Sequence, residues 1–148
     1  MARPEQAPGP VVIITSNVER QLPEPFLRRC VFYHVPFPDT QRLLKIVHSR
    51  FPDQDPPYLA RLVRIFEAAR LVPNLIKKPS TAEFLTWATA LIRAFSPESA
   101  RHYVEAFDTV MQHDGRAGGD WRWTDLPGAG CLFKLHEDLQ SAAEYATA

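Results

Sequence analysis

The sequence is poor in cysteine and carries no excess of charge of either sign. Two cysteines in 148 residues, Cys30 and Cys131, are too few for a disulfide framework and are typical of a reducing compartment. The 17 basic and 17 acidic side chains give a formal net charge of zero. This balance argues against an electrostatically driven nucleic-acid partner.

Long apolar runs are also missing. No run approaches the roughly 18–20 apolar residues that a membrane span needs, and residues 1–10 lack the apolar region of a signal peptide. We therefore expect a cytoplasmic protein without a membrane partner. The five histidines are scattered along the chain, so we expect no metal site formed by them.

The motifs that hold nucleotide phosphates and their metal are absent from the sequence. A P-loop has the pattern G-x-x-x-x-G-K-[ST], and no glycine of this chain is followed by lysine. No apolar run ends in Asp-Glu, the acidic pair that holds magnesium in such enzymes. The chain by itself is therefore not expected to hydrolyse ATP.

Two apolar segments near the start predict strands. Val11–Ile14 is β-branched throughout and apolar at every position, as in a strand buried on both faces of a parallel sheet. Val31–Phe37 is the second predicted strand, and Pro36 and Pro38 end it. Two strands cannot form a stable sheet alone, so these residues indicate part of a sheet whose other strands lie elsewhere.

The rest of the chain predicts helices. Asp39 is a good N-cap, and Ser80 with Glu83 has the spacing of a capping box. The 14 prolines lie mostly at boundaries between elements, and residues 131–145 predict a last short helix. The expected fold is mainly α, with a two-strand remnant of an α/β sheet. The apolar residues recur at helical spacing in Leu43–Phe51, Leu59–Ala69, Phe84–Phe95 and Tyr103–Met111.

Three motifs in order along the chain resemble the C-terminal portion of a MoxR-like AAA+ ATPase. The first is the apolar strand that ends in Thr15-Ser16-Asn17, and the second is Leu22-Pro-Glu-Pro-Phe-Leu-Arg-Arg-Cys30. The third is Lys77-Lys-Pro-Ser-Thr-Ala-Glu83 at a helix start. The resemblance covers about residues 10–95. It implies a lead-in (1–10), the last strands of the AAA+ core (11–38), a helical lid (39–113), and a flexible Gly-rich loop with a C-terminal extension (114–148).

The resemblance implies roles for the first two motifs. Asn17 falls where the family senses the γ-phosphate of ATP. Arg29 falls where an arginine finger reaches the neighbouring subunit, and Arg28 replaces the serine that clamp-loader relatives carry. Arginine suits this task because its charge is permanent and its donors form a planar fork. Read from the residues alone, Ser16-Asn17 is also ordinary turn chemistry, and a solvated arginine pair also suits a helix C-terminus.

The third motif occupies the sensor-2 position of the lid, where the family places an arginine. Thr81 lies near the place of that arginine here, so Lys77 or Lys78 would have to substitute for it. A helix N-terminus with a lysine can bind an anion. The alternative is an ordinary helix start with two solvated lysines.

The family implies ATP-driven remodelling of a client protein by a homo-oligomeric ring, with ATP and Mg²⁺ as cofactors of the complete member. Neither is expected to bind tightly to this chain alone, which would need an upstream P-loop portion or a ring partner. Two alternatives stay open: a non-enzymatic helical adaptor that supplies an arginine in trans, or a truncated product without function. Trp121 and Trp123 fit either a protein-binding patch or the chain's own core.

Overall fold

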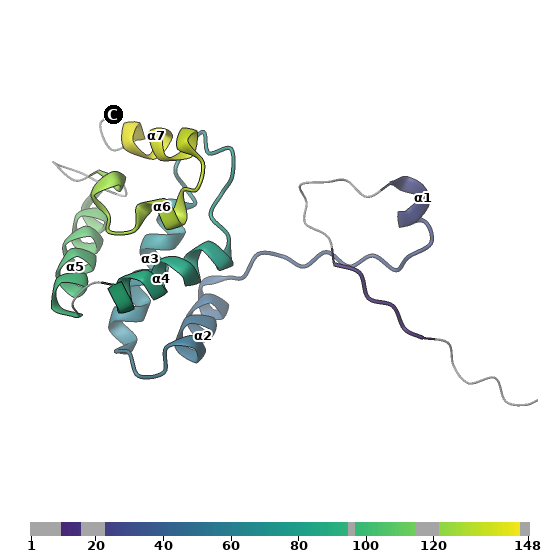
Figure 1. The fold of residues 1–148 in the computed structure, drawn as a ribbon, viewed down its shortest axis with the longest axis horizontal. Coiled ribbons are helices and arrows are strands. Elements are labelled where there is room, and N and C mark those ends of the chain that lie inside the picture. Colours follow the sequence, from purple (N-terminus) through teal and green to yellow (C-terminus); the bar gives the residue numbers. More distant parts are fainter. Residues whose placement is uncertain (1–9, 16–22, 95–96, 115–121, 146–148) are drawn as a thin grey trace, which may run out of the picture. The chain divides into compact units, whose positions relative to one another are not determined.

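The computed structural model describes residues 10–15, 23–94, 97–114 and 122–145 (Figure 1). Its contacts divide the chain into two units, Met1–Phe37 and Pro38–Ala148. We call these the first and second units and describe each by itself. The described residues are mainly helical and contain no strand, which confirms the expectation of a mainly α chain.

The first unit has one described helix, α1 (Glu24–Leu27). Val11–Ile14 and the segment from Val31 to Phe37 have no regular secondary structure, so neither predicted strand is present in this structure. The physical reason is that a strand exists only within a hydrogen-bonded ladder, and the described residues of this unit supply no ladder partner. Their large side chains are exposed instead: Val11, Val12, Ile13, Ile14, Val31, Phe32, Tyr33, Val35 and Phe37.

The second unit is helical, and its first helices start at local signals. The helices are α2 (Thr40–Arg50), α3 (Pro56–Ala69), α4 (Thr81–Ala94), α5 (Pro97–Asp114), α6 (Ala129–Leu132) and α7 (His136–Tyr145), with the 3₁₀ turn η1 (Trp123–Asp125). Asp39 caps α2 as predicted, because its carboxylate accepts the Arg42 N–H at 2.8 Å. Proline occupies the start of α3, where its missing N–H costs nothing.

The core of the second unit lies around α3. Helices α2 and α5 pack on α3, while α4 packs on α5 and α6. Phe66 of α3 stacks on Phe84 of α4 with ring centroids 4.5 Å apart. Both rings are fully buried, so the two central helices are joined by aromatic packing.

The C-terminal segment closes this core. Trp123 of η1 is buried, with its ring edge-to-face on Phe107 at 5.0 Å and on Phe133 at 5.8 Å. Trp123 therefore packs the chain's own core, whereas Trp121 lies outside the described residues. The predicted single helix over residues 131–145 is interrupted, since Phe133 leaves the helical region at φ −105° and ψ 89° and points inward.

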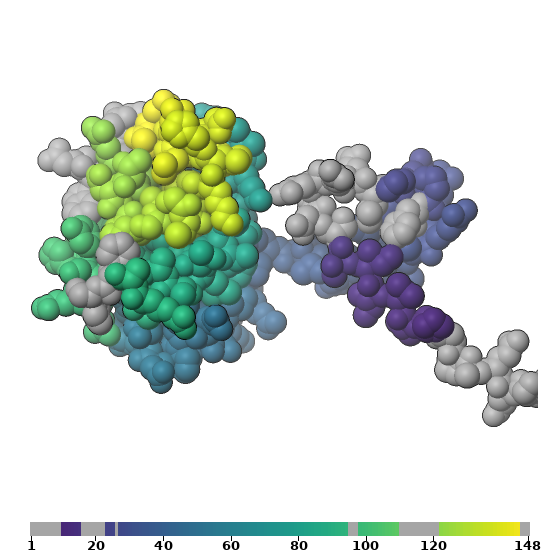
Figure 2. Space-filling view, viewed as in Figure 1, coloured from purple at the N-terminus to yellow at the C-terminus, as the bar shows by residue number. Residues whose placement is uncertain are grey.

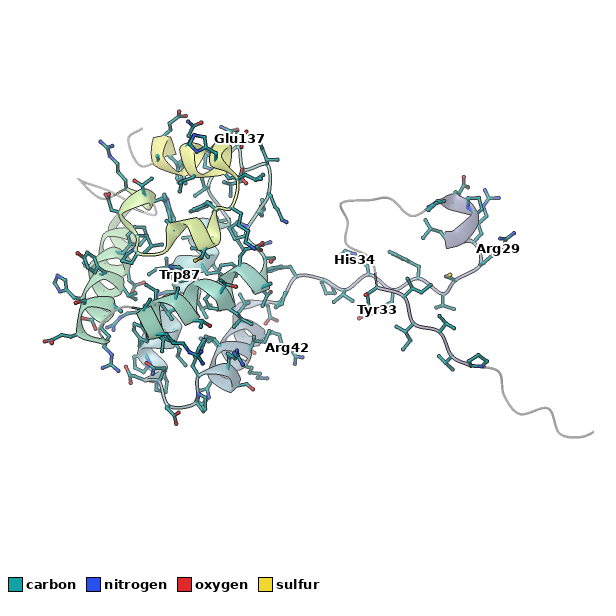
Figure 3. All side chains as sticks on the ribbon, in the orientation of Figure 1. Arg29, Tyr33, His34, Arg42, Trp87 and Glu137 are labelled. Atoms are coloured by element: carbon teal, nitrogen blue, oxygen red, sulfur yellow. The ribbon has the colours of Figure 1, made fainter. Side chains whose placement is uncertain are left out.

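Trp87 joins α4 to the turn before α6 (Figure 3). Its indole N–H donates to the Pro127 carbonyl oxygen at 2.8 Å. Gly128 follows at φ 75°, a backbone conformation that favours glycine.

No helix of the residues described here has both the length and the apolar character to cross a membrane.

Candidate functional site

The residues that the sequence singles out fall in two places. Arg28 and Arg29 lie in the first unit, directly after α1, while Lys77, Lys78 and Thr81 lie in the second unit before and at the start of α4. Asn17 lies outside the described residues. The two places are therefore described separately.

The arginine pair lies on a short turn of helix. Pro25 sits within the first turn of α1, and the Arg28 N–H donates to the Glu24 carbonyl at 3.1 Å, which extends the turn beyond Leu27. The Cys30 N–H then donates to the Leu27 carbonyl at 3.3 Å. Arg28 and Arg29 are thus presented on one tight turn, and both are exposed.

The two arginines differ in their partners. The Arg28 guanidinium donates to the Glu24 carboxylate one turn earlier. Arg29 has no ion pair with any residue that the structure describes, and its side chain projects from the chain after α1 (Figure 3). Both guanidinium groups are thus solvent-exposed, and they differ in that Arg28 also contacts Glu24.

The segment between α3 and α4 is held at both ends by Arg70. Its guanidinium donates to the Pro79 carbonyl oxygen and lies 5.9 Å from the centroid of the Phe66 ring. Burial lowers the pKa of Arg70, although the group stays charged. Asn74 at φ 60° turns the chain back between these ends.

Glu83 fixes the start of α4. Its carboxylate accepts the Ser80 N–H at 2.8 Å and the Ser80 hydroxyl, and it lies 3.3 Å from the Lys134 ammonium. Burial alone would raise the pKa of Glu83, but the hydrogen bonds from Ser80 and the Lys134 charge outweigh it and lower the pKa. Glu83 is thus an ionised, nearly buried group at the helix N-terminus.

Asp138 of α7 fixes the segment that leads to this helix. The side chain is 1% exposed. One carboxylate oxygen accepts the Ile76 N–H at 2.6 Å, and the other accepts the Lys77 N–H at 3.2 Å. The backbone immediately before Lys78 is therefore tied to the C-terminal helix.

Lys77, Lys78 and Lys134 surround a small cavity that Glu83 and Asp138 also line. Its volume of about 10 Å³ is close to the least that one water needs, so a phosphate group does not fit inside it. The Glu83 carboxylate also occupies the N-terminus of α4, which leaves less attraction for a second anion. The two sequence-predicted lysines are exposed, and Thr81 is half-buried.

These residues fit a nucleotide only in part. Two exposed ammonium groups can contact phosphate as point charges. The residues that the structure describes offer no cradle for it, and none of their His, Cys, Asp or Glu side chains form a group that could hold a metal ion. Lys77 and Lys78 are therefore exposed cations beside a cavity too small for phosphate.

Sequence reasoning missed the contribution of Asp138 and Lys134. The spacing of Ser80 and Glu83 did predict the cap of α4. Asp138, by contrast, looks in the sequence like any acidic residue in the first turn of a helix. Its partner Ile76 lies 62 residues away. A contact over that separation leaves no local pattern in the sequence.

The comparisons with known proteins add no relative. The chain matches no protein-family model, no curated protein and no solved structure.

Proposed function

We propose that this chain is the C-terminal portion of a MoxR-like AAA+ ATPase, a contributor to ATP-driven remodelling of client proteins in a ring. The observation that carries the proposal is the exposure of the two apolar segments that flank the arginine pair. Val11 is 90% exposed and Val31 fully so, although both belong to continuous apolar segments. Exposed apolar surface of this kind marks an interaction site.

The pattern of these segments favours one kind of partner. Successive side chains of a strand point to opposite faces, and all four residues of Val11–Ile14 are apolar. Both faces would therefore need cover, which is the situation of a strand in a parallel sheet with helices on both sides. The core of an AAA+ ATPase supplies such a sheet.

The roles proposed for single residues follow the three motifs. Asn17 would sense the γ-phosphate, and Arg29 would act on the nucleotide of the neighbouring subunit. Arg29 is preferred to Arg28 because it falls at the finger's place in the motif that ends at Cys30. ATP and Mg²⁺ would be held by the P-loop portion of the assembly, with Lys77, Lys78 and Thr81 approaching from the lid.

A second candidate function is a helical adaptor that joins an ATPase and lends it Arg29. The observation that favours it is the closed core of the second unit, which needs no further chain to bury Phe66, Phe84 and Trp87. A truncated product without function is the third possibility. Its exposed apolar segments would lead it to aggregate.

The experiment isolates the assembly that the tagged chain forms in its own cells and measures ATP hydrolysis per assembled chain. Arg29→Ala is compared with Arg42→Ala, an exposed arginine on α2 (Figure 3). We expect Arg29→Ala to lower the rate by about 10³-fold or more, as loss of an arginine finger does. Arg42→Ala should leave the rate unchanged.

Three outcomes separate the candidates. If the P-loop and this chain prove to be one polypeptide, the result supports the ATPase portion. If the P-loop is on a separate polypeptide and Arg29→Ala still abolishes stimulation, the adaptor is correct. An assembly without ATPase activity, or an equal rate for Arg29→Ala and Arg42→Ala, would contradict both.

A further inference from the structure

Two nearly buried carboxylates connect the C-terminal segment to the lysine segment, residues 76–80. Asp138 on α7 binds the Ile76 and Lys77 amides, and Glu83 on α4 binds Ser80 on one side and Lys134 on the other. Figure 2 shows yellow atoms of the C-terminal region beside teal atoms of the stretch before α4. The lysine segment is therefore bordered by groups from residues 134–138.

The contacts of Asp138 are directed at the backbone. An aspartate of this burial normally neutralises a cation or holds a metal, because an unpaired buried charge is costly. Here its two oxygens accept consecutive amides, so they fix the orientation of both peptide planes. Amides held in this way cannot rotate while the carboxylate stays in place.

We infer that Asp138 is a positioning residue for the lysine segment: it sets the backbone from which Lys77 and Lys78 project. Glu83 holds the other end of the segment at Ser80, and Lys134 holds Glu83. Residues 134–138 therefore help to position the lysine segment, although the motifs that pointed to it all lie before residue 95. The consequence for nucleotide contact rests on the proposed function, while the positioning itself does not.

The first test measures amide hydrogen exchange in the whole chain. In Asp138→Ala, the Ile76 and Lys77 amides should exchange about ten- to a hundredfold faster, since both lose a charged acceptor. In Asp138→Asn, an amide oxygen can still accept from Ile76, but an NH₂ group faces Lys77. We therefore expect Asp138→Asn to free the Lys77 amide while Ile76 keeps most of its protection.

The matched control is Glu137→Gln, the same change of charge one residue earlier on the exposed side of α7 (Figure 3). It should leave both amides protected. The amides of α3 report folding in every variant, so general unfolding is distinguished from local release. Unchanged exchange at Lys77 in both Asp138 variants, with α3 protected, would overturn the inference.

The second test separates the positioning role from the proposed function. In the isolated ATPase assembly, Asp138→Asn should raise KM for ATP about tenfold and leave kcat nearly unchanged. In a Lys77→Ala, Lys78→Ala background the same substitution should add nothing, because Asp138 acts through those residues. Two results would overturn the role in nucleotide contact: an unchanged KM in Asp138→Asn, or a further rise of KM in the double-lysine background. If amide exchange is still faster in the Asp138 variants, the positioning role itself stands.

Discussion

The two units of this chain use the same side chains in opposite ways. Val47 and Phe66 in the second unit are 0% exposed, whereas Val12 and Phe32 in the first unit are 75% and 68% exposed. Burying a side chain of this size contributes about 1.5–3 kcal/mol, so only the second unit gains stability from its apolar residues. The second unit buries its own apolar residues, whereas those of the first unit stay exposed, which is why we propose that a partner covers them.

The ion pairs repeat the contrast. Asp108 of α5, 7% exposed at its side chain, accepts two hydrogen bonds from Arg64 of α3 at 3.0 and 2.5 Å. The hydrogen bonds that the Arg64 guanidinium donates to this carboxylate raise the pKa of Arg64. In the first unit, the side chains of Arg28 and Glu24 are 75% and 74% exposed. Exposed pairs of that kind contribute little to stability.

The largest effect should come from a matched pair of phenylalanine substitutions. Phe66→Ala removes a fully buried ring that stacks on Phe84 and should lower the free energy of unfolding by about 3–5 kcal/mol. Phe32→Ala removes an exposed ring and should change it by less than about 0.5 kcal/mol. Urea unfolding followed by circular dichroism measures both, and equal losses would break the comparison.

The next effect concerns the ion pairs. Asp108→Ala leaves Arg64 without its two acceptors and should cost about 1.5–3 kcal/mol of stability. Glu24→Ala should produce no measurable change in the same urea titration, because the pair it breaks is solvated. A loss in Glu24→Ala as large as that in Asp108→Ala would show that the first unit is stabilised from within.

A smaller effect is expected from two glycines that lie close together in the second unit. Gly128→Ala would add a Cβ 3.1 Å from Trp87 Cδ1 at φ 75°, and it should cost about 1–2 kcal/mol. Gly130→Ala, in α6 with nothing within 4 Å of the added Cβ, should be neutral or stabilise by up to about 1 kcal/mol. Comparing the melting temperatures of the two variants tests how closely the core around Trp87 is packed.

The smallest effect is the contribution of Glu83 to the pH dependence of folding stability. Its pKa is lowered in the folded chain, so its contribution to stability is present above the usual glutamate value, about 4.3, and is lost as the pH falls below it. The neighbouring charges around its cavity are Lys77, Lys78, Lys134 and Asp138. As the pH falls below the usual glutamate value, the melting temperature of Glu83→Gln should therefore depend less on pH than that of wild type.

The exposed Glu98→Gln serves as control for that experiment and should follow wild type. If Glu83→Gln and wild type lose stability in parallel as the pH falls, the carboxylate is not held by Ser80 and Lys134 in the folded chain.

The features predicted correctly from the sequence are those that depend on neighbouring residues, such as helix caps. The cap at Asp39 and the Ser80–Glu83 spacing act within one turn, and α2 and α4 begin where they indicate, whereas α3 begins at Pro56, before the predicted apolar pattern. The two predicted strands are absent because a strand needs a hydrogen-bonded neighbour, and the described residues of the first unit do not supply one. The break at Phe133 and the Asp138 contacts depend on tertiary packing, and neither leaves a local signal.

The candidate site shows the same division. Arg28, Arg29, Lys77 and Lys78 were found by motif, and they lie exposed in the structure. The motif singled out Arg29 as the finger, whereas the contact between Arg28 and Glu24 was not predicted from the sequence. The roles proposed for these residues and for Asn17 stay predictions.

The most direct measurement is amide hydrogen exchange at residues 11–15 and 31–35, made on the isolated chain and on the assembly purified from its own cells. The account predicts fast exchange in the isolated chain and strong protection in the assembly, where these residues would become strands of a larger sheet. Residues 58–69 of α3 should be protected in both samples. Protection of 11–15 in the isolated chain, or fast exchange there in the assembly, would contradict the claim that the first unit is completed by a partner.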